Sequence, residues 1–460
     1  MSTLATLPVT SPYSGELVGE APVTSPAQIA SALDAAARAG SPPPRHERAR
    51  ALNAVADRLA DESEEWARLI TAESGLSLKD TRHEVGRAVD VCRFAAMEAL
   101  RDDGETFAGD VSERGRDRRA HTLRVPVSVV AAITPFNHPL NQVVHKVAPA
   151  IAAGAPVVLK PSERTPLSAL RLQDLLLDVG LGPERVRIVC GEPAAILDAF
   201  LAHPAVEVIS FTGGVAVGKE IARRLGYRRA VLELGGNDPL IVLGDADLDE
   251  AARLAVSGAF ANSGQRCSAV KRIIAVDGVA DELAERVAAG AAALRVGDPL
   301  DEDTDVGTVI DEAAAATIAR RVQDAVGAGA RLLYGGERDG ALLTPAVLDG
   351  VTPEMELVAT ETFGPVAPII RVRDLDEAIA TANGTPYGLS SGVCTFDWRA
   401  ISRCVRELRA GTVNIREVPG WRTELTPFGG VGDSGLGVKE GVREAVRAMS
   451  HTKLYTLPWA

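Results

Sequence analysis

The alternation of short β-branched runs with amphipathic helical stretches, which begins near Val127, is the feature that most restricts the fold of this chain. The runs "VSVVAAIT", "APVVLK", "RVRIVC" and "VEVISFTG" are separated by the stretches "NQVVHKVAPAIAAG" and "SALRLQDLLLDVG". Short apolar runs between amphipathic stretches are typical of parallel strands whose sheet is covered by helices on both faces. The pattern therefore predicts an α/β fold.

The stretch after "KPSER" shows the helical pattern in detail. Thr165 is predicted to cap this helix, Pro166 to occupy its first turn, and Gly180 to end it. An apolar stripe at helical spacing lies between them, formed by Leu172, Leu175, Leu176 and Val179. We expect that stripe to pack on the sheet.

A second alternating series follows "VLELGGNDP", with predicted strands at "KRIIAV", "RLLYGG" and "APIIRV" and helices between them. Because 460 residues exceed what one hydrophobic core usually serves, we expect separate domains. The alanine-rich region 26–100 is predicted to be helical and to wrap the first domain. The segments "SERGRDRRAHTLRVP" and "HTKLYTL" are predicted to be strands outside both domains.

Charge and hydropathy exclude several classes of partner. The net charge of -13 argues against general affinity for nucleic acid or anionic lipid. The N-terminal segment "MSTLATLPVTSPYSGELVGE" lacks the pattern of a signal peptide, and no run is long and apolar enough to span a bilayer. We therefore expect no membrane partner and a cytoplasmic location.

The five cysteines are scattered without a C-x-x-C pair, so neither a disulfide framework nor a metal site is predicted. Four lie in apolar surroundings that suit buried small side chains, namely Cys92, Cys190, Cys394 and Cys404. Cys267 instead lies in "NSGQRCSAV", directly after Arg266. A neighbouring cation favours the thiolate, so Cys267 is a candidate nucleophile, with an inert buried cysteine as the alternative.

Two further motifs supply groups that thiol chemistry at a carbonyl needs. "TPFNHP" follows a predicted strand and offers the Asn137 amide as an oxyanion donor, although asparagine near proline also suits a simple turn. His138 could equally be a hydrogen-bonded surface histidine. "VLELGGNDP" places Glu233 at the end of an apolar strand, where burial would raise its pKa and suit a general base. A structural salt bridge is the alternative for Glu233.

A glycine turn between a strand and a helix, in "SFTGGVAVGKEI", could present backbone N–H groups to a phosphate, although ordinary turns of this kind also use glycine. "VLKPSE" places Lys160 and Glu163 at the end of a neighbouring strand, where a ribose would lie in a dinucleotide-binding domain.

In this order, the motifs "TPFNHP", "LKPSE", "SFTGG", "LELGGND", "GQRC", "ETFGP" and "PFGGVGDSGLG" resemble the aldehyde dehydrogenase superfamily over essentially the whole chain. The resemblance implies NAD(P)-dependent, non-phosphorylating oxidation of an aldehyde to a carboxylic acid. It also implies a Rossmann-like NAD-binding domain (1–107 and 127–234), a catalytic domain (235–440) and a small β oligomerisation arm (108–126 and 441–460). A homodimer or homotetramer is expected.

The same resemblance assigns roles to single residues. Cys267 is similar to the nucleophile, Asn137 to the oxyanion donor and Glu233 to the base that activates the hydrolytic water. The residues that correspond to the cofactor site are Thr134, Pro135, Phe136, Lys160, Ser162, Glu163, Phe211, Thr212, Gly213, Gly214, Gly218, Leu234, Gly235, Glu361 and Phe363. NAD is favoured, because Glu163 would repel the 2'-phosphate of NADP, although NADP stays possible. The family usually has serine where this chain has Gly214.

Within the superfamily, "LRDDGETF", "ITPFNHPLNQVVHKVAPAIA" and "NSGQRCSAVKRI" resemble phosphonoacetaldehyde dehydrogenases in particular. That resemblance implies oxidation of phosphonoacetaldehyde to phosphonoacetate, with Arg101, Arg266 and His138 holding the phosphonate. A helix-terminal salt bridge with Asp102 or Asp103 is the alternative for Arg101. The loop "NIREVPGW" leaves the tail length open, so phosphonoformaldehyde and other phosphonate, sulfonate or phosphate aldehydes are alternatives.

Two other functions compete with aldehyde hydrolysis. Acyl transfer to coenzyme A occurs in some members of the superfamily, and Glu233 argues against it, because those members tend to lack this glutamate. A catalytically silent structural or binding protein is the alternative from another class, and the joint presence of Cys267, Asn137, Glu233 and Glu361 argues against that.

Overall fold

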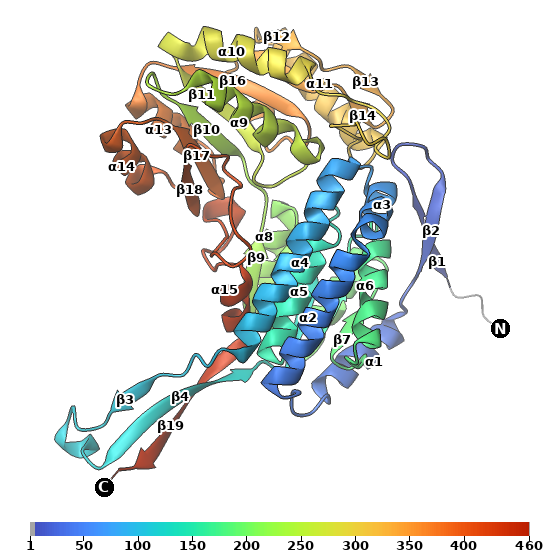
Figure 1. Ribbon diagram of the computed structural model, residues 1–460, viewed down its shortest axis with the longest axis vertical. Helices are drawn as coiled ribbons and strands as arrows, with labels where there is room; N and C mark the ends of the chain where they lie inside the picture. Colours follow the sequence, from blue (N-terminus) through green and yellow to red (C-terminus); the bar gives the residue numbers. More distant parts are fainter. Residues whose placement is uncertain (1–4, 460) are drawn as a thin grey trace.

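The computed structural model describes residues 5–459 and confirms the predicted α/β fold (Figure 1). One sheet and its helices form the lower half of the view, and a second, larger sheet forms the upper half. A narrow β arm projects from the lower half and carries the C-terminal strand. No helix of the described residues is both long enough and apolar enough to cross a membrane.

The lower sheet has five parallel strands in the order β7-β6-β5-β8-β9. These strands are β5 (Val129–Ile133), β6 (Val157–Lys160), β7 (Val186–Ile188), β8 (Val206–Thr212) and β9 (Arg229–Glu233). Strand β5 pairs with β6 on one side and with β8 on the other, so the strand order reverses there. Ligands of open α/β sheets bind at the carboxyl ends beside such a reversal.

Helices cover both faces of this sheet, as the apolar strands predicted. One face carries α2 (Arg45–Asp61), α3 (Ser63–Ser74), α4 (Leu78–Leu100), α5 (Asn141–Ala153), α6 (Leu167–Asp178) and α15 (Val442–Ala448). The other face carries α1 (Pro26–Ala37), α7 (Pro193–Ala202) and α8 (Val215–Arg224). Alternate residues of β5 point into the two cores, with Val130 in one and Ala131 in the other.

The start of α6 differs from the sequence prediction. Thr165 does not cap this helix, since its hydroxyl donates to the Phe136 carbonyl at 3.5 Å. The buried Glu73 carboxylate at the end of α3 instead accepts the N–H groups of Leu167 at 2.7 Å and Ser168 at 3.1 Å. A residue distant in sequence thus satisfies the free N–H groups at this helix terminus.

The upper sheet has seven strands in the order β12-β15-β16-β11-β10-β17-β18, of which only β12 runs antiparallel to its neighbour. These strands are β10 (Asp238–Val242), β11 (Val270–Val276), β12 (Arg331–Tyr334), β15 (Ala346–Asp349), β16 (Val366–Val372), β17 (Ser390–Cys394) and β18 (Thr412–Ile415). One face packs against α9 (Leu248–Phe260) and α10 (Asp277–Ala292). The other packs against α11 (Glu312–Gly327), α12 (Glu356–Ala359), α13 (Leu375–Asn383) and α14 (Trp398–Glu407).

The arm is a three-stranded antiparallel sheet in the order β19-β4-β3. Its strands are β3 (Thr106–Ala108), β4 (Arg118–Pro126) and β19 (Ser450–Pro458). Helix α15 falls in the segment predicted for the arm, but it packs against α4 and α5 instead. Two hairpins complete the fold, β1 (Thr6–Thr10) with β2 (Leu17–Pro22) and β13 (Arg338–Asp339) with β14 (Leu342–Leu343). The role of the arm in oligomerisation stays a prediction.

Candidate active site

A cavity of about 380 Å³ joins the carboxyl ends of β5, β8 and β9 to the loops of the upper sheet. Asn137, Glu233, Cys267, Glu361 and Phe363 all line it. These residues come from four separate motifs, and both sheets contribute to the lining. The structure therefore brings together the three predicted catalytic residues and two predicted cofactor residues.

A left-handed turn sets the position of Cys267. Asn262 and Ser263 have φ angles of 60° and 51° and are buried between α9 and Cys267. The Asn262 side-chain amide donates to the Asn137 carbonyl at 3.0 Å and so ties this turn to the loop after β5. Asparagine tolerates this backbone region better than most residues. Asn262 was not among the predicted site residues, although the Asn-Ser-Gly triplet is a signal for a left-handed turn.

The side-chain amide of Asn137 uses one of its two N–H donors within the protein. Its Nδ2 atom donates to the Gln265 carbonyl at 2.8 Å, two residues before Cys267. A carboxamide nitrogen carries two donors, so one N–H remains for a ligand in the cavity. The bond to Gln265 fixes the direction of that second donor.

Lys271 connects Cys267 to Glu361, although no role was predicted for this lysine from the sequence. Its buried ammonium forms an ion pair with the Glu361 carboxylate and donates to the carbonyls of Gly236 at 3.0 Å and Cys267 at 3.5 Å. The Gly236 N–H donates to the same carboxylate at 3.1 Å. Glycine at position 235 leaves room for this carboxylate, because a Cβ there would collide with Glu361. Lysine in the run "SAVKRII" gave no sign of this role.

Glu233 lies at the end of β9 with both carboxylate oxygens buried, and neither has a hydrogen-bond partner among the described residues. Burial, and then the charge of Glu440, raise the pKa of Glu233 well above its ordinary value, although Lys146 opposes the shift. Gly429 of the glycine-rich loop lies directly over it, since a Cβ there would be 2.6 Å from its Oε1 atom. The alternative of a salt bridge is therefore not what the structure shows.

Cys267 is partly exposed as a residue, whereas the other four cysteines are buried. Burial of the sulfur raises the pKa of Cys267 to about 11, against the opposing charges of Lys271 and Arg422. The resting thiol is thus protonated near neutral pH, and a reaction there requires removal of its proton.

The glycine turn and its neighbours suit a dinucleotide. Gly213 and Gly214 precede α8 and line the cavity, so the free N–H groups of this helix face a place where a phosphate could bind. The buried hydroxyl of Thr212 has no partner among the described residues, which leaves it for a ligand. Farther out, Lys160 forms a 2.7 Å ion pair with Glu163. These features fit NAD or NADP.

The predicted cofactor residues divide into two groups. Lining the cavity are Pro135, Phe136, Thr212, Gly213, Gly214, Leu234, Gly235, Glu361 and Phe363. The others do not line it, and two of them pack beneath it. The Phe211 ring lies under Gly213, and Gly218 lies against Leu234 so closely that a Cβ would collide. Thr134 and Ser162 are buried beside Lys160 and Glu163 at the strand ends.

The three residues predicted to hold the substrate do not form one clamp. Arg101 follows α4 and pairs with Glu98 at 3.5 Å and Asp103 at 3.8 Å, in a separate cavity that does not include Cys267. Arg266 donates to the carbonyls of Ser257 and Gly258, where α9 ends. The prediction for Arg101 is wrong, because α4 carries it to the opposite end of the helix from the active site.

His138 is buried and faces Glu84, with 3.7 Å between Nδ1 and the carboxylate. Burial lowers the pKa of His138, although Glu84 opposes the shift, so the imidazole is neutral at pH 7. Glu84 also accepts the N–H groups of Leu140 and Asn141 at 2.8 and 2.9 Å and caps α5. Neither His138 Nδ1 nor the Glu84 oxygen beside it has a hydrogen-bond partner among the described residues, and a role of His138 in substrate binding stays a prediction.

A different group of basic side chains lies beside the Glu424 carboxylate. Arg87, earlier on α4 than Arg101, forms a 2.5 Å ion pair with Glu424, and His145 contacts the same carboxylate at 2.6 Å. Burial opposes ionisation of Glu424, but His145 and Arg87 together hold its pKa well below the usual range. Arg422 stacks on Phe428, and its Nη1 atom is buried without a partner among the described residues. Both arginines interact electrostatically with the Cys267 sulfur.

Comparison with known proteins identifies the family. The model of the aldehyde dehydrogenase family matches residues 1–455. The chain belongs to this family. Aldehyde dehydrogenases similar to it include sulfoacetaldehyde dehydrogenase from Neptuniibacter caesariensis, 39% identical over 88% of this chain and 89% of the relative. The 3-sulfolactaldehyde dehydrogenase of Priestia aryabhattai is 38% identical over 93% of this chain and 89% of the relative.

Solved structures agree with this result. An NADP-dependent glyceraldehyde-3-phosphate dehydrogenase from Bacillus halodurans, complexed with NADP, superposes with a TM-score of 0.96 at 39% identity, covering 100% of this chain and 97% of that one. The predicted superfamily, the enzyme class and a nicotinamide dinucleotide cofactor are thereby confirmed. The narrower resemblance to phosphonoacetaldehyde dehydrogenase is not supported by these relatives.

Proposed function

We propose that this aldehyde dehydrogenase oxidises a short aldehyde with a sulfonate or phosphonate tail, and that Arg87 and Arg422 bind the tail. The observation that carries the proposal is that two arginines, both of which interact electrostatically with Cys267, share one carboxylate. Arg87 and Arg422 lie beside Glu424 together with His145, and the buried Nη1 atom of Arg422 has no partner among the described residues. An oxyanion tail would supply the missing acceptors, since guanidinium groups bind such tails through paired hydrogen bonds.

In the proposed reaction, the Cys267 thiol gives its proton to solvent in the cavity that it lines, and the thiolate adds to the aldehyde carbon. The carbonyl oxygen then carries negative charge and is held by the free Asn137 N–H and the Cys267 backbone N–H. A donor of this kind lowers the barrier by about 3 kcal/mol. When bound, NAD(P)+ supplies the two-electron acceptor that converts this adduct into a thioester on Cys267.

Glu233 then takes a proton from the water that hydrolyses the thioester. Two features support this role, namely a raised pKa and two oxygens without protein partners. The ion pair of Lys146 with Glu440, at 2.6 Å, lies close enough to influence Glu233 electrostatically. Proton removal by Glu233 favours hydrolysis over acyl transfer to coenzyme A.

Two relatives support the anionic tail, since they are named for sulfoacetaldehyde and 3-sulfolactaldehyde. A phosphonate tail, as predicted from the sequence, would bind the same arginines as a sulfonate tail and would carry one more negative charge. We also propose a preference for NAD, because the Glu163 carboxylate would repel the 2'-phosphate of NADP. Burial opposes ionisation of Glu163, but its 2.7 Å ion pair with Lys160 holds the pKa of this carboxyl below its usual value. The positive charge of Lys160 neutralises part of the negative charge of Glu163.

The experiment is steady-state NADH formation with sulfoacetaldehyde, phosphonoacetaldehyde and propionaldehyde. We expect kcat/KM for both anionic aldehydes to exceed that for propionaldehyde, and this preference to fall at least ~10-fold in Arg422→Gln and Arg87→Gln. Activity on propionaldehyde should change much less in these variants, because it lacks the tail. Arg101→Gln is the matched control and should keep the preference.

Equal rates on all three aldehydes would discard the anionic substrate while leaving the aldehyde dehydrogenase family intact. Loss of the preference in Arg101→Gln alone would restore the original assignment of that residue. Faster turnover with added coenzyme A, accompanied by an acyl-coenzyme A product, would instead favour acyl transfer.

A further inference from the structure

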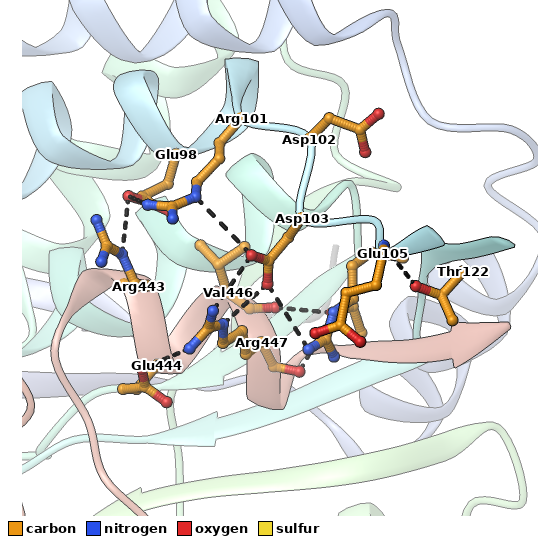
Figure 2. Close-up of polar contacts among 12 residues, drawn as sticks. Glu98, Arg101, Asp102, Asp103, Glu105, Thr122, Arg443, Glu444, Val446 and Arg447 are labelled. Carbon is orange, nitrogen blue, oxygen red and sulfur yellow. Dashed lines mark hydrogen bonds and ion pairs between the residues drawn. The ribbon is translucent and has the colours of Figure 1, made fainter. Parts of the chain in front are cut away.

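A second cluster of arginines surrounds a small cavity at the base of the arm, away from the active site (Figure 2). Six arginines line this cavity, namely Arg45, Arg48, Arg101, Arg124, Arg443 and Arg447. They come from the start of α2, the end of α4, strand β4 of the arm and helix α15. Only two carboxylates, Glu98 and Asp103, line the same cavity. Such an excess of positive charge stands out in a chain with a net charge of -13.

The two carboxylates are shared among several arginines. Asp103 accepts from Arg447 at 2.9 Å and lies 3.7 Å from Arg124 and 3.8 Å from Arg101. Glu98 accepts from Arg443 at 3.2 Å and lies 3.5 Å from Arg101. Figure 2 shows these side chains of the loop after α4 and of α15 converging on Asp103 and Glu98. Arg447 also donates to Glu444 at 3.1 Å, so four arginines share three carboxylates and guanidinium donors remain for a ligand.

The remaining two arginines contact mainly backbone oxygens. Arg45 donates to the Arg101 carbonyl and, at 3.4 Å, to Asp102. Arg48 donates to the carbonyls of Ile151 and Ala152, and its Nε atom is buried without a partner among the described residues. The side chain of Arg48 is only 8% exposed. A buried guanidinium with no carboxylate partner is costly unless an anion neutralises it.

The size of the cavity restricts the ligand. Its volume is about 60 Å³, which is room for roughly four to six water-sized atoms. A nucleotide does not fit this space, whereas one tetrahedral oxyanion does. Arg101, Arg443 and Arg447 are each about two-fifths exposed, so an ion can enter from solvent.

We propose that this cavity binds one small tetrahedral oxyanion of the phosphate or sulfate class. The ion links the helical body to the arm, because its arginines belong to α2, β4 and α15. Charged hydrogen bonds from several guanidinium groups to one oxyanion are strong and directional. Binding should therefore stabilise the attachment of the arm.

The test is isothermal titration of the full-length protein with inorganic phosphate and with sulfate at constant ionic strength, chloride being the reference anion. We expect Arg443→Gln to weaken phosphate binding at least ~10-fold. Asp103→Asn should have the opposite effect and strengthen it, because it removes the carboxylate that competes for three arginines. Arg93→Gln, on the exposed face of α4 and 4.0 Å from Asp57, is the matched control.

Phosphate could also bind beside Cys267, and Arg87→Gln separates the two sites. Binding that disappears in Arg87→Gln and persists in Arg443→Gln would overturn the proposal. So would phosphate and sulfate that bind no better than chloride. If either cavity variant fails to fold, the other decides the question, because their expected effects on affinity have opposite signs.

Discussion

Lys271 and Glu361 form an ion pair, and the Lys271 ammonium also donates to the Cys267 carbonyl at 3.5 Å. The same ammonium lies 5.0 Å from the centre of the Phe363 ring. One lysine thus contacts a carboxylate and a ring predicted for the cofactor site, together with the backbone of the predicted nucleophile. Lys271 therefore helps to fix the position of the predicted nucleophile relative to the predicted cofactor site.

We therefore expect Lys271→Met to lower kcat by roughly 10- to 100-fold, because it removes three hydrogen bonds and leaves the half-buried Glu361 carboxylate without its ion-pair partner. The measurement is steady-state kinetics with the preferred aldehyde, together with cofactor titration. Lys79→Met is the control, since Lys79 also pairs with a carboxylate, Asp305, but at the surface. Equal losses in both variants would mean that Lys271 has no special role.

Glu233 should control the pH dependence of hydrolysis. Its raised pKa means that the carboxyl group is protonated at the acidic end of the working range and becomes a base only as the pH rises. We expect kcat to rise about 10-fold per pH unit below that pKa and then to level off. In Glu233→Gln the rise should disappear, and each active site should release about one NADH in a burst before turnover stalls.

A Glu233→Gln enzyme that turns over steadily without a burst would remove Glu233 from the hydrolytic step. Cys267→Ala provides the companion control, because it should release no NADH at all while still binding the cofactor.

Gly214→Ser should strengthen cofactor binding. Gly214 precedes α8 in an extended conformation, with φ -67° and ψ 146°, and nothing lies within 4 Å of a Cβ placed there. Serine fits that conformation and would cap the helix, adding a hydroxyl where a pyrophosphate could bind. We expect the KM for NAD to fall several-fold, with a small rise in melting temperature. An unchanged KM would show that this hydroxyl does not reach the cofactor.

The cap of α6 should make stability depend on pH. Burial raises the pKa of Glu73 to about 7, although bonds from Ser168 and Leu167 oppose the shift. The folded protein then holds this proton between about pH 4.5 and 7, where the unfolded chain has lost it. The contribution of Glu73 to stability is therefore complete below pH 4.5 and declines as the pH rises to 7, by at most ~3 kcal/mol.

Glu73→Gln removes this titration but keeps an oxygen acceptor for the helix. We expect the melting temperature of wild type, relative to Glu73→Gln, to fall between pH 5 and 7.5. A constant difference across that range would contradict the prediction. Glu192→Gln, which alters an exposed cap at the start of α7, serves as the control.

The α/β architecture could be predicted from the sequence, because strand and helix periodicity follow from local side-chain pattern. The sequence also singled out Cys267, Asn137 and Glu233, which lie in short motifs with unusual polar or glycine neighbours. The structure brings all three to one cavity. Parallel strands end at a common edge, so motifs that each follow a strand meet there.

Contacts between distant segments were decided only by the tertiary structure. Glu73 replaces Thr165 as the cap of α6, and Lys271 joins Glu361 to the Cys267 carbonyl. Arg101 and Arg87 lie on or next to the same helix, yet only Arg87 lies near the thiol. Their 14-residue separation corresponds to about 21 Å along a helix, which no motif records. Local pattern fixes the elements, whereas the packing of those elements decides which charges meet.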